Sequence, residues 1–389
     1  MNPETWVEHN LNALREQHLE RSLSPMPETG GVILTPQGPL LNFGSNDYLN
    51  LARHPHVIQR SADALRQYGA GATASRLIAG TLPIHEELET RLAAYKGRPA
   101  CLVFGSGYLA NAGSIPALVD RGDTILADRL SHACIIDGAV LSRASRLRFQ
   151  HNDMDHLASM LAQQRKGRKL IVTESVFSMD GDIAPLRELV RLAQEHDAML
   201  LVDEAHATGV FGPAGSGLIR AEGLQDGVTL SMFTMSKGMG GYGGAVACSS
   251  AMKQWLINKA RAFIFTTALP PAVLGSTLGA IDVLEREPDL GATLLQRAQL
   301  LRKLLTDGGL DCLGSQSQII PVLVKDNEKV VRIATKLRDQ RILVGAIRPP
   351  TVPLGTARLR LSVTLAHTDE HLRRTAAAVI AVCREESVS

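Results

Sequence analysis

The chain has few cysteines, and none is placed for a shared site. The five, Cys101, Cys134, Cys248, Cys312 and Cys383, are odd in number and contain no Cys-x-x-Cys pair. This spacing indicates neither a disulfide framework nor a zinc site. We therefore expect reduced, mostly buried thiols and no bound metal.

Long apolar runs and blocks of one charge are also missing. No apolar stretch approaches the roughly 20 residues that a membrane helix needs, and the first residues lack the basic-then-apolar layout of a secretory signal. The 41 basic and 39 acidic residues give a formal charge of +2 without a long block of either sign. We therefore expect a cytoplasmic protein with no nucleic-acid or membrane partner.

The chain shows no internal repeat and no low-complexity stretch, and it alternates apolar runs with segments of helical period. Apolar runs lie at 101–104, 124–127, 170–173, 199–202, 228–233 and 244–248. Helical spacing lies between them, at 83–95, 154–164 and 185–196. Strands without polar alternation, each followed by a helix, predict a parallel sheet with both faces covered.

These patterns predict three segments. Residues 50–274 form a large α/β domain with a mostly parallel sheet. Residues 1–49 hold a helix at 4–20 and small strands. Residues 275–389 form a smaller α+β domain, because 318–324 and 356–364 alternate apolar and polar residues as half-exposed antiparallel strands do.

Four junctions at the ends of predicted strands carry functional groups, and open α/β sheets bind ligands at such ends. Asp203 directly follows an apolar run, where an acid is costly to bury without a cation. Lys237 follows the next run, between hydroxyls and glycines that let a backbone approach a ligand. The turn at 105–108 opens a helix whose N–H groups can bind phosphate, and Tyr108 can cover a planar ring. His132 lies just past another strand end.

Each junction taken alone also has an ordinary interpretation: a capping Asp203, a surface Lys237 or a structural His132. Two motifs compete as well. Residues 203–206 spell the box of a family of nucleic-acid helicases, but no Gly-x-x-x-x-Gly-Lys-Ser/Thr loop precedes them. Residues 105–110 fit the G-x-G-x-x-A dinucleotide fingerprint, but a nicotinamide site would leave the lysine and the aspartate unexplained.

Together the four junctions fit pyridoxal 5′-phosphate (PLP). This cofactor needs an amine to form an imine, a carboxylate that keeps its pyridine nitrogen protonated, a phosphate cradle and a group stacked on its ring. Lys237, Asp203, the turn at 107–108 and His132 supply one each. We therefore expect Lys237 and Asp203 to converge on a single cavity.

At these residues the chain resembles the α-oxoamine synthases, PLP enzymes of the aspartate-aminotransferase fold type. The likeness runs over nearly the whole length, through motifs at 42–49, 128–133, 177–182, 202–206, 234–238 and 265–271. It implies a fold-type I PLP-dependent acyltransferase with a large, mostly parallel sheet domain and a smaller α+β C-terminal domain. It also implies a homodimer with shared active sites.

The resemblance implies roles for individual residues. Lys237 would carry the cofactor and later remove the α-proton, and Asp203 would pair with the pyridinium. His206 would bond the phenolic oxygen, while His132 would stack on the ring and assist at the new ketone. The other residues expected to bind the cofactor are Ser106, Gly107, Tyr108, Ser178, Thr234, Ser236, Thr266 and Thr267, with Thr266 or Thr267 reaching a phosphate across a subunit boundary.

The resemblance also predicts the substrate contacts. Asn46 and Arg360 would hold the carboxylate of the amino acid, a task for which a guanidinium is well shaped. Arg21, His132 and Thr351 would contact the acyl substrate.

The stretch 346–361 resembles the branch of the family that condenses L-alanine with a pimeloyl thioester, on coenzyme A or a carrier protein, in biotin synthesis. A relative that uses another thioester, or glycine or serine, is the alternative. A non-catalytic partner subunit is a further one, against which the presence of Lys237 argues. Residues 71–76 and Asn50, where a glycine is common, depart from the family pattern and bear on the acyl preference.

Overall fold

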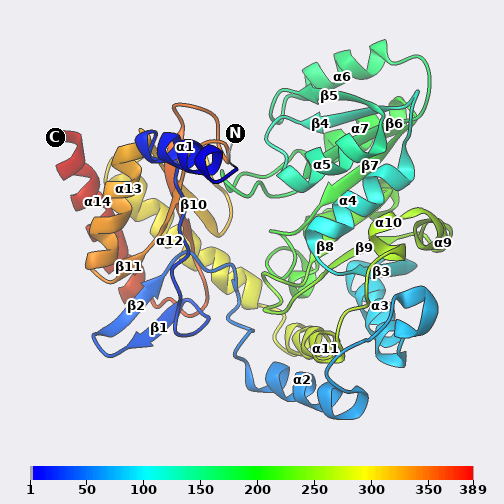
Figure 1. Cartoon of the computed structure of the whole chain (residues 1–389), viewed down its shortest axis with the longest axis horizontal. Helices are drawn as coiled ribbons and strands as arrows, with labels where there is room; N and C mark the ends of the chain where they lie inside the picture. Colours follow the sequence, from blue (N-terminus) through cyan, green and yellow to red (C-terminus); the bar gives the residue numbers. More distant parts are fainter. Residues whose placement is uncertain (1–2, 389) are drawn as a thin grey trace. The chain divides into compact units, whose positions relative to one another are not determined.

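The computed structural model of the chain describes residues 3–388 and divides them into two compact units (Figure 1). The larger unit comprises residues 46–178 and 182–293. The smaller unit comprises the segment up to Ser45, residues 179–181 and the segment from Leu294 onward. The N-terminal segment thus groups with the C-terminal part. The sequence patterns place a domain boundary near residue 274, but helix α11 (Pro271–Arg286), which contains that position, belongs to the larger unit.

Within the described residues, the larger unit holds one sheet with the strand order β3-β9-β8-β7-β6-β4-β5. Its strands are β3 (Ala100–Phe104), β4 (Thr124–Asp128), β5 (Ser145–Phe149), β6 (Lys169–Glu174), β7 (Ala198–Asp203), β8 (Leu230–Thr234) and β9 (Gly244–Cys248). Strands β4 to β8 run parallel, and β9 is antiparallel to both of its neighbours. The predicted α/β class with a mostly parallel sheet is confirmed. The sequence patterns did not predict the edge strand β5, because its exposed arginines interrupt the apolar pattern.

Helices fill the connections between these strands. They are α2 (Pro55–Tyr68), α3 (Pro83–Lys96), α4 (Gly107–Leu118), α5 (Ala133–Ser142), α6 (Met154–Gln163), α7 (Leu186–Glu195), α8 (Leu218–Ala221), α9 (Ser250–Lys259), α10 (Arg261–Ile264) and α11. Short turns of helix add η1 (Arg76–Gly80), η2 (Pro213–Gly215) and η3 (Gln225–Gly227). The helices predicted at 83–95, 154–164 and 185–196 are confirmed to within one residue at each end.

The core of the larger unit forms where apolar strands meet α4, α5 and α9. Its wholly buried strand residues include Leu102, Ile125, Leu170, Leu201 and Val246. Burial of one such side chain stabilises the fold by about 1.5–3 kcal/mol. Carboxylates come at the last residue of β4, β6 and β7, as Asp128, Glu174 and Asp203. The apolar strands thus deliver these acids to one edge of the sheet.

The smaller unit contains two three-stranded sheets among its described residues, with the orders β1-β2-β11 and β10-β13-β12. The elements are α1 (Pro3–Glu16), β1 (Val32–Thr35), β2 (Gly38–Asn42), β10 (Ile319–Lys325), α13 (Asn327–Asp339), β11 (Ile342–Leu343), β12 (Gly345–Ile347), β13 (Ala357–Ser362) and α14 (Asp369–Val388). Helix α12 (Leu290–Asp307) contains the division between the two units. None of the helices within residues 3–388 is long and apolar enough to cross a membrane.

The antiparallel pairing predicted for 318–324 and 356–364 is confirmed, as β10 pairs antiparallel with β13. The prediction that both strands are half-exposed is wrong for β13, whose six residues are all buried. Its polar positions are buried because they have partners within the unit. The Arg358 guanidinium lies 2.5 Å from the Asp180 carboxylate, and Arg360 donates to the Ser362 hydroxyl at 2.8 Å.

A buried ion pair fixes the segment that follows β7. Lys96 Nζ, at the end of α3, lies 2.6 Å from Glu204 Oε2 and also donates to Thr208 Oγ1 and the Ser216 carbonyl. The side chains of Lys96 and Glu204 are 1% and 0% exposed. All three ammonium hydrogens thus have acceptors, which a buried charge requires. Glu204 therefore has a structural role, and the match of residues 203–206 to a helicase motif is a chance match of four residues.

Lys96→Met is predicted to lower the free energy of unfolding by about 3–5 kcal/mol, because it leaves the Glu204 charge buried without its partner. Chemical denaturation measures the loss as a shift of the midpoint. The control is Arg191→Met, which removes an exposed ion pair with Glu195 and is predicted to move the midpoint very little. Equal small shifts in both variants would contradict the structural role of Lys96.

Candidate active site

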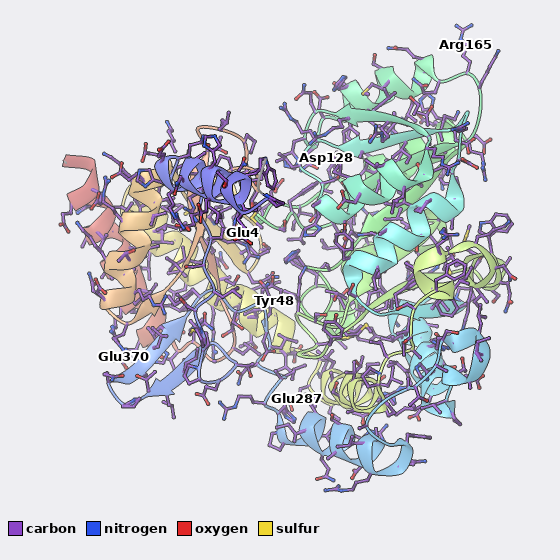
Figure 2. The ribbon with its side chains drawn as sticks, viewed as in Figure 1. Glu4, Tyr48, Asp128, Arg165, Glu287 and Glu370 are labelled. Atoms are coloured by element: carbon purple, nitrogen blue, oxygen red, sulfur yellow. The ribbon has the colours of Figure 1, made fainter. Side chains whose placement is uncertain are left out.

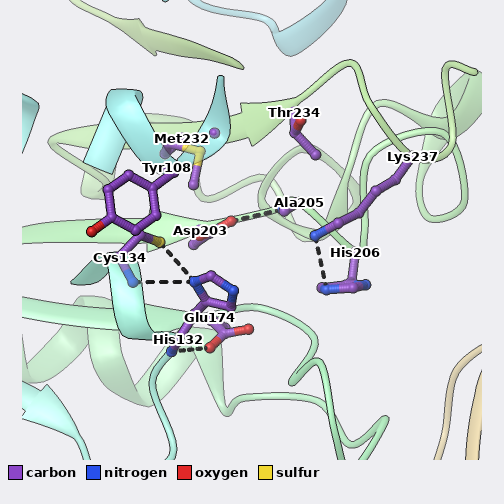
Figure 3. Close-up of a pocket in the computed structure, with 11 residues that line it drawn as sticks. Tyr108, His132, Cys134, Glu174, Asp203, Ala205, His206, Met232, Thr234 and Lys237 are labelled. Carbon is purple, nitrogen blue, oxygen red and sulfur yellow. Dashed lines mark hydrogen bonds between the residues drawn. The ribbon is translucent and has the colours of Figure 1, made fainter. Parts of the chain in front are cut away.

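A cavity of about 220 Å³ lies in the larger unit at the carboxyl ends of β6, β7 and β8 (Figure 3). Its lining contains seven of the residues predicted for the site: Gly107, Tyr108, His132, Asp203, His206, Thr234 and Lys237. The lining also includes Cys134, Glu174, Ala205 and Met232. The amine of Lys237 and the acid of Asp203 therefore face one cavity, as the sequence led us to expect.

Lys237 lies on the loop where the chain leaves parallel β8 and returns as antiparallel β9. This tight return requires a glycine at 240: its φ is +63°, and a Cβ there would lie 2.3 Å from the backbone nitrogen of Ala52. Lys237 Nζ lies 2.9 Å from His206 Nε2. His206 Nδ1 lies 2.7 Å from the Tyr48 hydroxyl, which donates to Asn46 Oδ1 at 3.2 Å.

This chain of contacts has one consistent direction. Tyr48 gives its own hydrogen to Asn46, so its oxygen accepts from His206 Nδ1–H, and His206 Nε2 then accepts from the Lys237 amine. The histidine therefore orients the amine by accepting from it. Tyr48 was not predicted for the site, although it lies inside the 42–49 motif.

Asp203 is the most constrained acid of the cavity. It is 5% exposed, and its two oxygens accept from the Ala205 N–H and from Asn111 Nδ2, each at 2.8 Å. Burial raises the pKa of Asp203, and this effect outweighs the lowering by Lys237 and by these two hydrogen bonds. Among the described residues no cation forms an ion pair with it, so the carboxylate can take a cationic ligand from the cavity side.

The N-terminus of α4 forms a second wall of the cavity. Ser106 caps the helix by accepting from the Leu109 N–H at 3.1 Å, and Gly107 and Tyr108 begin it. The first N–H groups of a helix have no intrahelical partner and can bind an anion. A Cβ on Gly107 would lie only 3.4 Å from the Thr234 Cβ, so a side chain there would fill the space between the helix and the strand.

The N-cap of α5 determines the protonation of His132. The Cys134 N–H donates to His132 Nδ1 at 3.2 Å, so this nitrogen accepts and the ring hydrogen lies on Nε2. Cys134 Sγ lies 2.9 Å from the same nitrogen and accepts from Asn111 at 3.2 Å. Burial lowers the pKa of His132. Figure 3 shows both contacts between the His132 ring and Cys134. The imidazole is therefore held neutral, as a donor through Nε2.

Besides Tyr48, three groups of this site were missed by sequence reasoning: Glu174, Cys134 and Asn111. Glu174 Oε1 accepts from the His132 N–H at 2.7 Å, and Asn111 joins Asp203 to Cys134. Glu174 carried a usable signal, since it is an acid directly after an apolar run, as Asp203 is. Asn111 and Cys134 sit inside helices and carried none.

Other predicted cofactor residues lie in the larger unit but do not line the cavity. Ser236 shares hydrogen bonds with Thr234 and with the Gly243 carbonyl. Thr267 forms a backbone bridge with Ser75, and Thr266 precedes it. The remaining ones are Ser106, which caps α4, and Ser178, which is buried. Asn46, predicted to hold the carboxylate of the amino acid, accepts from the Tyr48 hydroxyl, which contacts His206.

The predicted residues Arg21, Thr351 and Arg360 belong to the smaller unit. Arg21 and Thr351 are exposed, and Arg360 is buried on β13. Their contacts with substrate stay predictions.

Of the two departures from the family pattern, the one at Asn50 has a local structural explanation. Asn50 has a φ of 58°, a left-handed conformation that glycine adopts freely and asparagine tolerates. In the 71–76 segment, Arg76 forms a buried ion pair with Glu89 at 2.9 Å.

An ion cluster ties together the loops beside the cavity. His151 Nδ1 lies 3.0 Å from Asp128, at the end of β4 (Figure 2), and its Nε2 lies 2.8 Å from Asp182. Burial lowers the pKa of His151, but the hydrogen bonds and charges of the two carboxylates outweigh it and raise the pKa to about 10. A charged His151 thus anchors the 128–132 loop, which carries His132, to the end of the 177–182 motif.

The residues of the cavity fit PLP. A carboxylate with two neutral donors and, among the described residues, no ion-pair partner suits a protonated pyridine. An amine faces the same space, and the α4 terminus offers free N–H groups. Within residues 3–388 no group of three or more His, Cys, Asp or Glu side chains is arranged to hold a metal ion. The dinucleotide interpretation does not fit, because β3 is an antiparallel edge strand rather than the first strand of a central βαβ unit.

Comparison with known proteins identifies the relatives of the chain. The model of the family "Aminotransferase class I and II" matches residues 38–379. The chain is 45% identical over 379 residues to an 8-amino-7-oxononanoate synthase of Geobacter sulfurreducens, covering 96% of this chain and 97% of that protein. It is 46% identical over 378 residues to one of Anaeromyxobacter dehalogenans, covering 97% and 95%.

Solved structures agree on the fold. A serine palmitoyltransferase of S. paucimobilis with bound PLP has a TM-score of 0.92 and 31% identity, covering 99% of this chain and 98% of that one. An 8-amino-7-oxononanoate synthase of Francisella tularensis has a TM-score of 0.79 and 29% identity, covering 90% and 99%.

The contribution of His151 to stability is predicted to depend on pH. Its pKa is raised in the folded state, so its stabilisation is fully present below the unfolded value of about 6.5 and is lost as the pH rises through about 10. His151→Gln should therefore lose on the order of 3 kcal/mol at pH 6.5 and progressively less toward pH 10. Denaturation across that range measures the difference. His156→Gln, on α6, is the control, and a difference for His151→Gln that stays constant with pH contradicts the assignment.

Proposed function

Because this chain belongs to the class I and II aminotransferase family, and within it to the α-oxoamine synthases, we propose that it condenses L-alanine with a pimeloyl thioester. The α-carbon of alanine bonds to the thioester carbonyl, the thiol leaves, carbon dioxide is lost and 8-amino-7-oxononanoate forms. The observation that carries the proposal is the convergence of Lys237 and Asp203 on one cavity. The 45–46% identity to 8-amino-7-oxononanoate synthases supports the choice of substrates.

PLP is the cofactor of this reaction, and when bound it supplies a protonated ring that accepts the electron pair left at the α-carbon. Asp203 keeps the ring nitrogen protonated, and Lys237 attaches the cofactor. The first N–H groups of α4, at Gly107 and Tyr108, hold the phosphate. Thr234 closes the space beside them.

Lys237 is also the base. Its amine takes the proton from the α-carbon, and His206, 2.9 Å away, orients it. His132 faces the same cavity as a neutral donor through Nε2, which suits a hydrogen bond to the carbonyl oxygen of the acyl group. The amine thus transfers the proton, and the neutral imidazole stabilises the carbonyl oxygen by a hydrogen bond.

Charges in the smaller unit suit an acyl group that ends in a carboxylate. Arg348 donates to the backbone carbonyls of His18 and Glu20, just before Arg21. Burial and the nearby charge of Arg21 lower the pKa of Arg348. Two neighbouring guanidinium groups favour an anionic ligand, and pimelate has a free carboxylate. Arg360 and Asn46 are proposed to hold the carboxylate of alanine.

A second candidate is an α-oxoamine synthase with another acyl thioester, or with glycine or serine. The TM-score of 0.92 to a serine palmitoyltransferase favours it. The higher identity to 8-amino-7-oxononanoate synthases, 45% against 31%, favours the first proposal. Five buried free thiols suit the reducing cytoplasm, where we place the reaction.

Purified protein is predicted to bind PLP with an absorbance band at the visible edge of the ultraviolet and to release carbon dioxide from alanine with pimeloyl-coenzyme A. Lys237→Ala loses the covalent attachment and the base together, so the band disappears and the rate falls by at least about 10⁴-fold. Lys259→Ala, at the exposed end of α9, is the control and keeps both.

The panel of substrates separates the two candidates. Alanine, glycine and serine are titrated against the cofactor band, and each is then assayed with pimeloyl-, acetyl- and palmitoyl-coenzyme A. Turnover of serine with palmitoyl-coenzyme A alone contradicts the first proposal and supports the second. A wild-type protein that takes up no PLP contradicts both.

We further propose a homodimer whose sites are shared. Thr266 and Thr267 do not line the cavity of their own chain, and the segments bridged by Ser75 and Thr267 expose large apolar side chains. Ile78 is 84% exposed and Phe265 is 71% exposed. Exposed apolar side chains gathered on adjoining segments are typical of a subunit interface.

Sedimentation is predicted to give twice the 41.9 kDa mass of the chain. Phe265→Asp places a charge in the apolar contact and should raise the dissociation constant of the dimer by more than about tenfold, with weaker PLP binding. Leu34→Glu, at an exposed position of β1, is the matched control. A wild-type monomer with full affinity for PLP contradicts the shared site.

A further inference from the structure

Glu174 is a carboxyl group of the cavity to which the proposed reaction gives no role. It is the last residue of β6, it is 2% exposed, and it lines the cavity together with Asp203. In the parallel pairing of β6 with β7, Glu174 is in register with Asp203. Side chains in register on neighbouring strands point to the same face of a sheet. Two buried carboxyl groups therefore lie side by side in the wall of the cavity.

Such a pair is costly when both members are ionised. Like charges a few ångströms apart in a buried place repel strongly, so a proton stays on the pair. The donors around the pair decide which member keeps it. Asp203 accepts from two N–H groups, whereas Glu174 accepts from one, the His132 N–H at 2.7 Å. Hydrogen-bond donors stabilise an anion, so Asp203 is the anion and Glu174 holds the proton.

The other charges around Glu174 agree with this assignment. The titratable groups that face it are Asp128 on β4, His132 before α5, Cys134 on α5, Asp203 on β7 and Lys237 after β8. Among the described residues none of the cations forms an ion pair with Glu174. Burial, with the charge of Asp203 adding to it, raises the pKa of Glu174 to about 8, against the opposing effects of the His132 N–H and Lys237.

We propose that Glu174 stays protonated at neutral pH and acts as a neutral positioning residue, which holds the backbone of His132 and leaves Asp203 as the carboxylate that pairs with the cofactor ring. The inference rests on the proposed function, since it assigns a role within that active site. Glu174 acts through His132: its oxygen fixes the N-cap residue of α5, and the same cap directs Nε2–H of the imidazole to the cavity.

Two variants test this role. Glu174→Gln keeps the shape, the neutral charge and an oxygen that accepts from the His132 N–H, so kcat is expected to fall by less than about threefold. Glu174→Leu leaves that N–H without an acceptor, so the N-cap of α5 and the imidazole of His132 lose their fixed position. We expect kcat to fall by more than about tenfold, with little change in the KM for alanine, because the misplaced group is the donor of His132.

Infrared spectroscopy measures the proton directly. Labelling the glutamates with ¹³C in the wild-type holoenzyme is expected to shift the C=O stretch of a protonated carboxyl at pH 7, and labelling the aspartates is not. The same band is expected to be absent from Glu174→Gln. Because the labelling uses the wild-type chain, it gives an answer even if a variant fails to fold.

Two results overturn the proposal. One is a loss of a hundredfold or more in Glu174→Gln, which is the size expected when an ionised acid–base group is removed. The other is a wild-type spectrum without a protonated glutamate. A protein that shows the glutamate band and binds PLP but does not condense alanine with a pimeloyl thioester contradicts the proposed function and leaves the proton assignment of Glu174 intact.

Discussion

A negative charge buried at the end of β7 constrains the whole site. Asp203 accepts from a backbone N–H and from Asn111, and these donors stabilise its charge only in part. A buried acid stays ionised when a cation pairs with it, and the protonated ring of PLP is a cation of suitable shape. The neighbouring residues follow from this requirement. Asn111 must reach Asp203 from α4, and Glu174 beside it must stay neutral for the charge to remain single.

The sheet supplies the geometry that this charge needs. Parallel β6, β7 and β8 end at the same edge, so that Glu174, Asp203 and the loop of Lys237 meet there without a long connection. The antiparallel return of β9 folds the Lys237 loop back over the edge. The Lys96–Glu204 pair and the His151 cluster then fix the segments on either side. In both cases a buried charge holds a loop in place. The side chains that face the cavity are therefore not needed to fix the conformation of these loops.

Hydrogen-bond direction assigns opposite tasks to the two histidines of the cavity. His132 accepts at Nδ1 from a helix N-cap and is left to donate through Nε2, whereas His206 donates to Tyr48 and accepts from Lys237. One histidine is thereby suited to an oxygen of the substrate and the other to the amine. The residue type is the same, and the backbone and Tyr48 around each ring make the difference.

The sequence by itself determined the α/β class, the positions of the main strands along the chain and the junctions that carry Asp203, Lys237 and His132. An apolar run that ends in a charged group indicates both a buried strand and the end of that strand at which ligands bind. It did not determine β5, whose exposed arginines interrupt the apolar pattern. It also did not determine the burial of β13, because Arg358 has a partner that is distant in sequence, Asp180. Nor did it reveal Tyr48, Asn111 or Cys134 as parts of the site. Their roles depend on hydrogen bonds between residues up to 158 positions apart, and only the tertiary structure brings such groups within 3 Å of each other. The pattern of apolar residues along a chain indicates which segments are buried. The direction of a hydrogen bond and the protonation of a side chain depend on residues that are neighbours in space.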